Sequence, residues 1–471
     1  MIVGSLNVTV LSIAALLIVL LSISTLTTKP LSSSVLGSVG GKPYPQTSTE
    51  QFNVLRFGGA LAPYVSHHGY GVGPETPEDC VVDQVHLLMR HGERYPTYDS
   101  GKRFEKLLNK LQKLSNVETY TGPLAFIKDY KYFATDEDYE LETHSGPYNG
   151  LEDSYKVGLK FREKYGHLFD DQNEVLPVFS AGQERVVDTA KSFAKGFLAK
   201  SANDSLLSLQ ALPESSAQGA NTLTAATSCK PFDYSENDEL LSKYSTKYLE
   251  KAANRLNRLS PGFNIDADDA FQMMSLCGFE LNVRGDPVWC KLFTKDEWVA
   301  FGYQRDLDFY YRASYGHSLA VAIGSNYANA TATLLKEGPS EVGKLFFSFS
   351  HDTDITPVVA AMGLLQSASH LSVDQIDFFS PFKCSQIVPM GAKVVVERLK
   401  CSTDGKAYAR IILNDSVIPL ANCSDGPGFS CEVNDYHERI IRGLKGTTYT
   451  EVCQIDEDLP QSLEVYWNWS K

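Results

Sequence analysis

Residues 80–97 read CVVDQVHLLMRHGERYPT, an apolar run that is followed by a cluster of charged side chains. The β-branched and apolar residues of its first ten positions are typical of a buried strand. Directly after them, His91 lies between Arg90 and Arg94, whose positive charges disfavour a second proton on the imidazole ring. Two guanidinium groups and a histidine at the end of a buried strand are suited to binding an anion.

Two more apolar segments have the composition of buried strands, EVLPVFSA at 174–181 and KLFFSFS at 344–350. All three segments are followed by a polar turn and a helical pattern; these patterns cover residues 103–114, 186–200 and 354–363. Repeated strand, loop and helix units predict an α/β fold with a mostly parallel central sheet flanked by helices. Near the C-terminus, 393–401 and 407–415 alternate around a turn at Asp404-Gly405, which predicts an antiparallel pair at the sheet edge.

The order of these patterns divides the chain into four parts. Helical patterns at 238–259, 294–312 and 318–336 predict an inserted, mostly α domain over residues 201–339. The α/β catalytic domain would then consist of residues 74–200 and 340–471. Residues 29–73 are rich in Ser, Gly, Pro and Thr and are expected to form a linker or an N-terminal arm.

Several features indicate the secretory pathway. Residues 1–28 carry no charged side chain and are mostly apolar, as in a signal peptide, although an uncleaved signal anchor stays open. The chain has nine cysteines, which suggests disulfides. N-glycosylation sequons stand at Asn203, Asn329, Asn414, Asn422 and Asn468. We therefore expect a secreted protein in the extracellular space, the periplasm or the cell wall. The net charge of −14 argues against a nucleic-acid partner.

All three predicted strands end in charged residues. Besides Arg90 and its neighbours, the second strand is followed by Gln183-Glu184-Arg185 and the third by His351-Asp352-Thr353-Asp354. In open α/β sheets, ligands bind outside the carboxyl ends of the strands, so these segments should converge at one crevice.

The converging residues suit phosphoryl transfer. Guanidinium groups bind phosphate oxygens in bidentate fashion and stabilise charge as a phosphoester bond breaks. A neutral histidine at the centre can attack phosphorus and form a covalent intermediate. Asp352 can protonate the departing alkoxide. Gly92 permits close approach of the backbone, and Pro96 stiffens the end of the loop.

The motif Arg90-His91-Gly92-x-Arg94-x-Pro96 with the downstream His351-Asp352 resembles the signature pair of the histidine acid phosphatases. The segments VHLLMRHGERYPT, FSFSHDTDI, LFTKDEW and CSDGPGFSCEVNDY are similar to those of secreted yeast acid phosphatases, relatives of the fungal phytases. This resemblance covers most of the chain, from about residue 55 to 469, and implies a phosphoglycerate mutase-like fold.

The resemblance also implies roles for individual residues. His91 would be the phosphohistidine nucleophile and Asp352 the proton donor. The implied phosphate ligands are Arg90, Arg94, Arg185 and His351. The implied disulfides are Cys80–Cys401, Cys229–Cys453, Cys277–Cys290 and Cys423–Cys431, with Cys384 free. Glu93 adds a negative charge beside this site, and its effect on substrate choice stays open.

Single residues of these motifs, and two other patterns in the chain, also allow different interpretations. Taken singly, Arg90 or Arg94 fits a surface salt bridge, and Asp352 fits a helix cap. Gly316-His317-Ser318-Leu319-Ala320 nearly matches the nucleophile elbow of a serine esterase, but the final glycine is absent and no core strand precedes it. His86 and His91 would lie on opposite faces of a strand with no third ligand, so neither a metal nor a cofactor is expected.

The lysines of the first helical pattern have two readings. They either form a solvated helix face or extend a positive funnel for a polyphosphorylated substrate; they are Lys102, Lys106, Lys110 and Lys113.

These observations predict an acid phosphatase that hydrolyses orthophosphate monoesters through a phosphohistidine. The alternatives are a phytase acting on myo-inositol hexakisphosphate, a phosphomutase, and a non-catalytic, phosphate-binding cell-wall glycoprotein. The expected partners are small phosphate monoesters, with no membrane contact unless the leader is retained as an anchor. Formation of a homo-oligomer stays open.

Overall fold

The computed structural model describes residues 53–115, 120–198, 204–285 and 288–469. The predicted leader and most of the predicted arm lie outside these residues, as does the sequon at Asn203. Among the described residues, no helix has both the length and the hydropathy that crossing a bilayer requires.

The described residues contain an eight-stranded mixed sheet in the order β3-β2-β4-β1-β5-β6-β7, with β8 paired to β6. Its strands are β1 (Cys80–Arg90), β2 (Leu176–Ala181), β3 (Leu207–Leu212), β4 (Leu345–Ser350), β5 (Lys393–Cys401), β6 (Ala407–Leu413), β7 (Ser416–Val417) and β8 (Cys431–Glu432). The pairs β3-β2, β2-β4 and β4-β1 are parallel, whereas the pairs from β1 to β7 are antiparallel. This confirms the predicted α/β fold with its parallel core and its antiparallel strands towards one edge.

The register of the parallel strands brings the predicted site segments together. Arg90, the last residue of β1, pairs with Ser350, the last residue of β4. On the other side of β4, Ser180 of β2 pairs with Phe349. The carboxyl ends of three strands that are distant in sequence therefore lie at one edge of the sheet.

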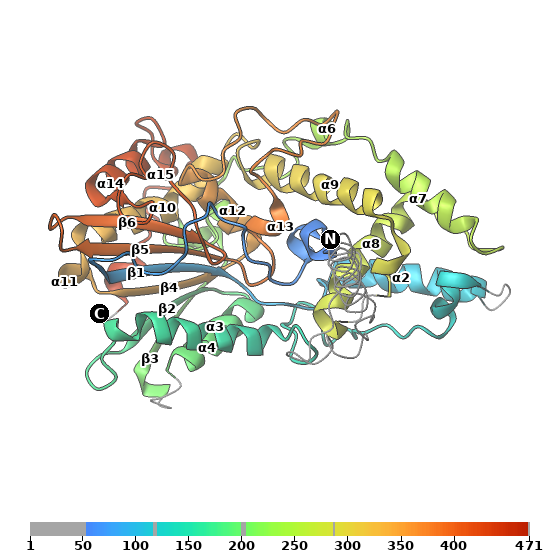
Figure 1. The fold of residues 1–471 in the computed structure, drawn as a ribbon, viewed down its shortest axis with the longest axis horizontal. Coiled ribbons are helices and arrows are strands. Elements are labelled where there is room, and N and C mark those ends of the chain that lie inside the picture. Colours follow the sequence, from blue (N-terminus) through green and yellow to red (C-terminus); the bar gives the residue numbers. More distant parts are fainter. Residues whose placement is uncertain (1–52, 116–119, 199–203, 286–287, 470–471) are drawn as a thin grey trace, which may run out of the picture. The chain divides into compact units, whose positions relative to one another are not determined.

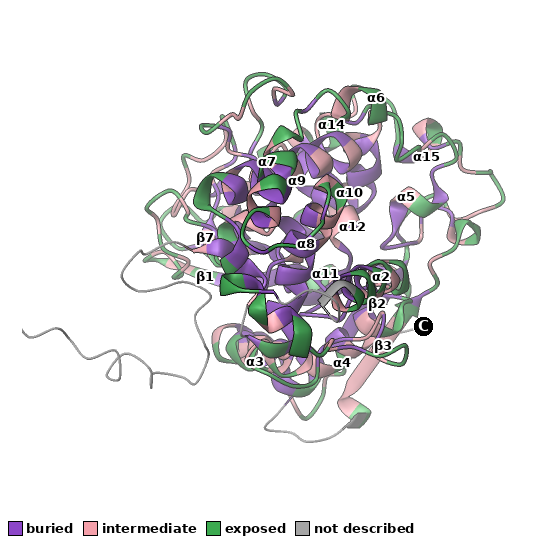
Figure 2. Cartoon of the chain, turned by 90° about the vertical axis from the view of Figure 1, so that its right-hand side faces the viewer, coloured by how far each residue is buried: buried purple, intermediate pink, exposed green. Residues whose placement is uncertain are grey.

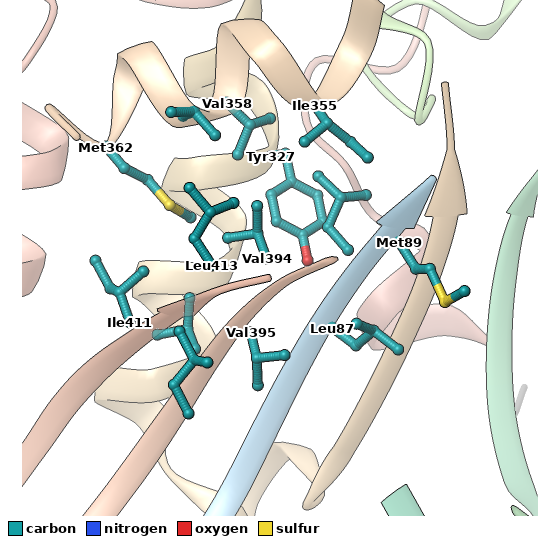
Figure 3. Close-up of a cluster of buried hydrophobic side chains, with 14 of the residues drawn as sticks. Leu87, Met89, Tyr327, Ile355, Val358, Met362, Val394, Val395, Ile411 and Leu413 are labelled. Carbon is teal, nitrogen blue, oxygen red and sulfur yellow. The ribbon is translucent and has the colours of Figure 1, made fainter. Parts of the chain in front are cut away.

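Helices cover both faces of the sheet (Figure 1). The helices α3 (Gly150–Tyr165) and α4 (Glu184–Phe197) cover one face, and α10 (Ala320–Glu337), α12 (Asp352–Ala361) and α14 (Val433–Arg442) cover the other. Figure 3 shows Ile355, Val358 and Met362 of the α12 segment facing strand residues such as Val394 and Leu413. All five side chains are buried, and burying one such side chain contributes about 1.5–3 kcal/mol.

A second group of helices packs around a separate apolar core. It consists of α2 (Tyr98–Ser115), α7 (Lys247–Asn257), α8 (Ala267–Arg284) and α9 (Lys295–Ala313). Trp289 and Trp298 are almost fully buried in this core, and Val54 and Leu55 of the arm also belong to it. Figure 2 shows α8 and α9 largely buried.

The remaining α-helices of the described residues have four residues each. They are α5 (Ala225–Ser228), α6 (Asp238–Leu241), α11 (Pro339–Val342), α13 (Cys384–Ile387), α15 (Tyr449–Val452) and α16 (Val465–Asn468). The 3-10 turns are η1 (Val54–Phe57), η2 (Gly59–Leu61), η3 (Gly122–Asp129), η4 (Gly166–Leu168), η5 (Asp204–Leu206), η6 (Ser216–Gln218) and η7 (Cys290–Leu292).

Some helices and strands inside the predicted insertion, residues 201–339, pack against elements outside it. β3 and α10 fall within residues 201–339, yet β3 pairs with β2 and α10 packs on α12 and α14. Conversely, α2 lies outside that range but packs against α8. The division into an α/β domain and an insertion therefore stays a prediction.

The structure contains the four disulfides that the family resemblance implies. They join Cys80 to Cys401, Cys229 to Cys453, Cys277 to Cys290 and Cys423 to Cys431. Cys384 is buried and unpaired.

One predicted glycosylation site is wrong, because Asn414 is fully buried. Its Nδ2 atom, to which a glycan would attach, donates hydrogen bonds to the carbonyl oxygens of Gln386 and Ile387. Asn422 and Asn468 are exposed and Asn329 is half-buried, so these three stay predictions.

Candidate active site

Arg90 is the last residue of β1 and lies beside the cavity residue Asp352. Its side chain is fully buried, and Nη1 donates to the carbonyl oxygens of Ala60 and Val388, both at 2.7 Å. Nη2 contacts Oδ2 of Asp352 at 2.7 Å. The backbone of the arm and of the Val388 segment therefore fixes this guanidinium beside the carboxylate.

The ring of His91 is oriented by its own loop. Nδ1 lies 2.9 Å from the carbonyl oxygen of Gly92, which can only accept a hydrogen bond, so Nδ1 carries the proton. The lone pair of the neutral ring is then on Nε2. Burial, and then the charges of Arg90, Arg185 and Arg94, lower the pKa of His91 well below its usual value. At acidic pH the ring therefore remains neutral and nucleophilic.

Two more guanidinium groups face the same space. Nη1 of Arg94 donates to the carbonyl oxygen of Tyr95 at 2.9 Å, and its guanidinium lies 5.5 Å from the ring centre of Phe279. Arg185 lies in the first turn of α4, where its Nη1 binds Oε2 of Glu140 at 2.8 Å. Because each arginine is held by a neighbour, the positive charges are arranged before any anion binds.

The end of β4 supplies the other two predicted residues. His351 is the N-cap of α12, and Asp352 is its first residue. Burial raises the pKa of Asp352, but the charges of Arg90, Arg94 and His351 outweigh that effect and hold the pKa below its ordinary value. The empty site thus favours the carboxylate, whereas a bound phosphate anion would draw these positive charges to itself and favour protonation.

These side chains border one cavity of about 420 Å³. Its lining residues are His91, Arg94, Gln183, Arg185, Glu214, Thr224, Ala226, Thr227, Phe232, Tyr234, His351, Asp352, Thr353 and Asp354. Five of the six predicted site residues line the cavity, and the sixth, Arg90, contacts Asp352 from below.

The site also contains Glu214, which follows β3 and was not predicted from the sequence. Its Oε1 atom lies 3.0 Å from Nε2 of His351 and accepts a hydrogen bond from the backbone N–H of Gln183 at 2.9 Å. The signal that could have found it is a fourth strand end, since β3 is parallel to β2 and also points towards the site.

The buried pair of Glu142 and Thr189 beside His91 was not predicted from the sequence either. Thr189 Oγ1 accepts from the N–H of Gly92 at 3.1 Å and lies 2.6 Å from Glu142 Oε1. Burial raises the pKa of Glu142 to about 8, although the hydrogen bond from Thr189 acts in the opposite direction. No motif marks these residues, because their role depends on contacts between distant segments.

The Glu93 carboxylate does not line the cavity, so its charge is not placed to contact a substrate there. Its Oε1 atom accepts a hydrogen bond from the backbone N–H of Tyr64 at 3.0 Å, and Glu93 is absent from the residues that line the cavity. Glu93 therefore ties the arm to the histidine motif.

The lysines of α2 do not form a positive funnel at this cavity. Lys102 contacts Glu105 and Asp136, Lys110 contacts Asp269, and no lysine is among the described residues that line the cavity.

The serine-esterase alternative does not fit the structure. Ser318 lies in the connection between α9 and α10, and not between a strand and a helix. Its hydroxyl donates to Glu236 at 2.6 Å.

Comparisons with known proteins identify the family of this chain. The family model of the histidine phosphatase superfamily (branch 2) matches residues 81–414. The chain is 44% identical to acid phosphatase PHO1 of Komagataella pastoris, over 92% of this chain and 93% of that protein. It is 36% identical to phytase PHO112 of Candida albicans, over 90% and 92% of the two chains. The crystal structure of the phytase from D. castellii, 36% identical, superposes with a TM-score of 0.87 over 92% of this chain and 97% of that one.

The family match at residues 81–414 includes His91 and Asp352, and the relatives align over nearly their whole length. The chain therefore belongs to branch 2 of the histidine phosphatase superfamily.

Proposed function

We propose that this protein is an acid phosphatase that hydrolyses orthophosphate monoesters through a phosphohistidine at His91. The observation that carries the proposal is the buried imidazole of His91 among three guanidinium groups, with Asp352 in the same cavity. The relatives named acid phosphatase support the same activity.

The first step transfers the phosphoryl group to the enzyme. Nε2 of His91 attacks phosphorus while Arg90, Arg94, Arg185 and His351 bind the phosphate oxygens. The phosphorus–oxygen bond to the alcohol breaks, and Asp352 gives its proton to the departing alkoxide.

The second step regenerates the enzyme. A water molecule gives a proton to the carboxylate of Asp352 and attacks phosphorus, and the bond between phosphorus and Nε2 breaks. Inorganic phosphate leaves, and both side chains return to their starting protonation states. Because Asp352 must be protonated in the first step, the rate should fall as pH rises above the pKa that this residue has in the substrate complex.

The test is a panel of alkyl and aryl phosphate monoesters assayed across pH. We expect hydrolysis that is fastest at acidic pH and absent in His91→Ala. Unchanged activity of His91→Ala would remove the histidine from the mechanism, and a protein that binds phosphate without hydrolysing any ester would be the non-catalytic glycoprotein.

Phytase activity is the second candidate, because two of the similar proteins carry that name. Initial rates on phytate and on p-nitrophenyl phosphate at matched concentration separate the two activities.

We further propose that the protein is secreted. The four disulfides and the exposed sequons at Asn422 and Asn468 support an oxidising, glycosylating pathway. Recovery of the glycosylated chain from the culture medium is expected, and its confinement to the cytosol would contradict this proposal.

A further inference from the structure

The residues that line the cavity are of two chemical kinds. Arg94, Arg185 and His351 are the proposed phosphate ligands. Uncharged groups also line the cavity, the rings of Phe232 and Tyr234 together with Thr224, Ala226 and Thr227. We call the two rings the aromatic wall; their ring centres lie 4.7 Å apart at an interplanar angle of 76°.

Several contacts fix the aromatic wall in place. The Cys229–Cys453 disulfide anchors the chain just before it. Arg312 Nη1 donates to the carbonyl oxygen of Tyr234 at 2.6 Å. The ring of His317 lies 4.7 Å from that of Phe232, and its Nε2 contacts the carbonyl oxygen of Asp233 at 3.0 Å. The wall is therefore preorganised, although Tyr234 is 42% exposed and open to a ligand.

The charges around the cavity disfavour a second phosphate group. Among the described lining residues, the only arginines are Arg94 and Arg185, and both are proposed phosphate ligands. Glu214 also lines the cavity, and its pKa is lowered, so it is a carboxylate. Lys230, beside the aromatic wall in sequence, is paired with Asp456 at 2.5 Å. A leaving group with further phosphates would meet the Glu214 carboxylate and aromatic rings, and no lysine or further arginine among the described lining residues.

We propose that the aromatic wall binds the leaving group and selects planar, uncharged alcohols, so that aryl phosphate monoesters are preferred to polyphosphorylated polyols. This inference rests on the proposed phosphatase activity and deepens it. Stacked or edge-to-face ring pairs contribute an amount that corresponds to about three- to tenfold in kcat/KM.

The experiment compares kcat/KM of the full-length protein on 1-naphthyl phosphate and on glycerol 2-phosphate. For Tyr234→Ala, the loss relative to wild type should be about three- to tenfold larger on the naphthyl ester. Tyr234→Phe keeps the ring and should keep the wild-type ratio of the two substrates. Phe379→Ala is the matched control, because Phe379 is 96% exposed and does not line the cavity.

A lysine at the wall tests the charge argument directly. Tyr234→Lys should lower the KM for phytate while it raises the KM for 1-naphthyl phosphate, because an ammonium group replaces the ring.

The inference is overturned if Tyr234→Ala loses the same factor on both esters, or if wild-type kcat/KM on phytate exceeds that on 1-naphthyl phosphate. A wild-type protein that hydrolyses none of these esters would instead overturn the proposed function itself.

Discussion

At the scale of single residues, the chemistry depends on opposite protonation requirements of two neighbouring groups. Burial and nearby arginines lower the pKa of His91, so it stays neutral in acid. Asp352 has to gain a proton, although Arg90 beside it favours the carboxylate. Acidic solution and a bound phosphate anion both favour the proton on Asp352, whereas burial, the largest effect on His91, keeps the pKa of that ring low.

Asp352→Asn should slow the hydrolysis of ethyl phosphate by roughly 10²–10⁴-fold, because the amide cannot protonate a poor leaving group. The loss on p-nitrophenyl phosphate should be much smaller, since that leaving group departs without a proton. Because Asp352 also takes part in the second step, which is common to both esters, kcat/KM on the two esters is the measurement that checks this prediction, since it reports only the steps up to release of the alcohol. Equal losses on the two esters would show that Asp352 is not the acid.

Glu214→Gln should weaken competitive inhibition by inorganic phosphate about tenfold, because hydrogen bonds to charged groups contribute about 1.5–3 kcal/mol. The carboxylate of Glu214 contacts His351 at 3.0 Å and orients that ring towards the cavity. Glu438→Gln in α14 is the control, since Glu438 is exposed and forms an ion pair with the exposed Arg442. An unchanged inhibition constant in Glu214→Gln would mean that Glu214 does not position His351.

The motif residues were predictable because a short stretch carries them in fixed order, His91 between Arg90 and Arg94. Glu214 and Glu142 were not predictable, because a lone glutamate has no signature until the fold brings it to a partner. The burial of Asn414 was equally invisible, since a sequon specifies three residue types and says nothing about solvent access.

At the scale of elements, the three strands with long apolar runs, β1, β2 and β4, were predicted at nearly their observed positions. β3 was missed because its sequence, LSLQAL, includes the polar residues Ser208 and Gln210 and is mostly half-buried, which gives a weaker apolar signal than the fully buried β2 and β4 of the same length. The helix α2 begins at Tyr98, five residues before the predicted start, because Tyr98, Asp99 and Ser100 are not apolar enough to extend the pattern.

The strand β1 also contains His86, a buried histidine that lowers the stability of the folded state at acidic pH. His86 is almost fully buried, stacks on Phe346 at 4.5 Å, and neither ring nitrogen has a hydrogen-bond partner among the described residues. Burial lowers its pKa from 6.5 to about 3. Since the unfolded chain binds this proton near pH 6.5 and the folded chain only near pH 3, stability falls as the pH drops between those values.

His86→Leu should therefore remove a loss of roughly 3 kcal/mol between pH 7 and pH 4. Thermal unfolding of wild type and variant at the two pH values measures it, and the gap in Tm between pH 7 and pH 4 should shrink in the variant. A gap of the same size would show that His86 does not contribute to acid sensitivity.

At the scale of the whole molecule, the chain combines four disulfides, which are typical of secreted proteins, with a site in which the pKa of His91 is lowered. Four disulfides join segments up to 321 residues apart, and the arm reaches the site through Ala60 and Tyr64. The overall fold class was predictable from repeated strand and helix units. The division into domains stays a prediction, and the packing of α2 on α8 and of α10 on α12 and α14 crosses its limits.

The central claim is that His91 carries the phosphoryl group during turnover, and rapid-quench trapping with a radiolabelled phosphate monoester tests it most directly. We predict an alkali-stable, acid-labile label on the peptide that contains His91 in the wild type, accumulating in Asp352→Asn when the leaving group is p-nitrophenol. No label should appear in His91→Ala. A label on another residue, or full turnover with no labelled protein at any time, would contradict the account.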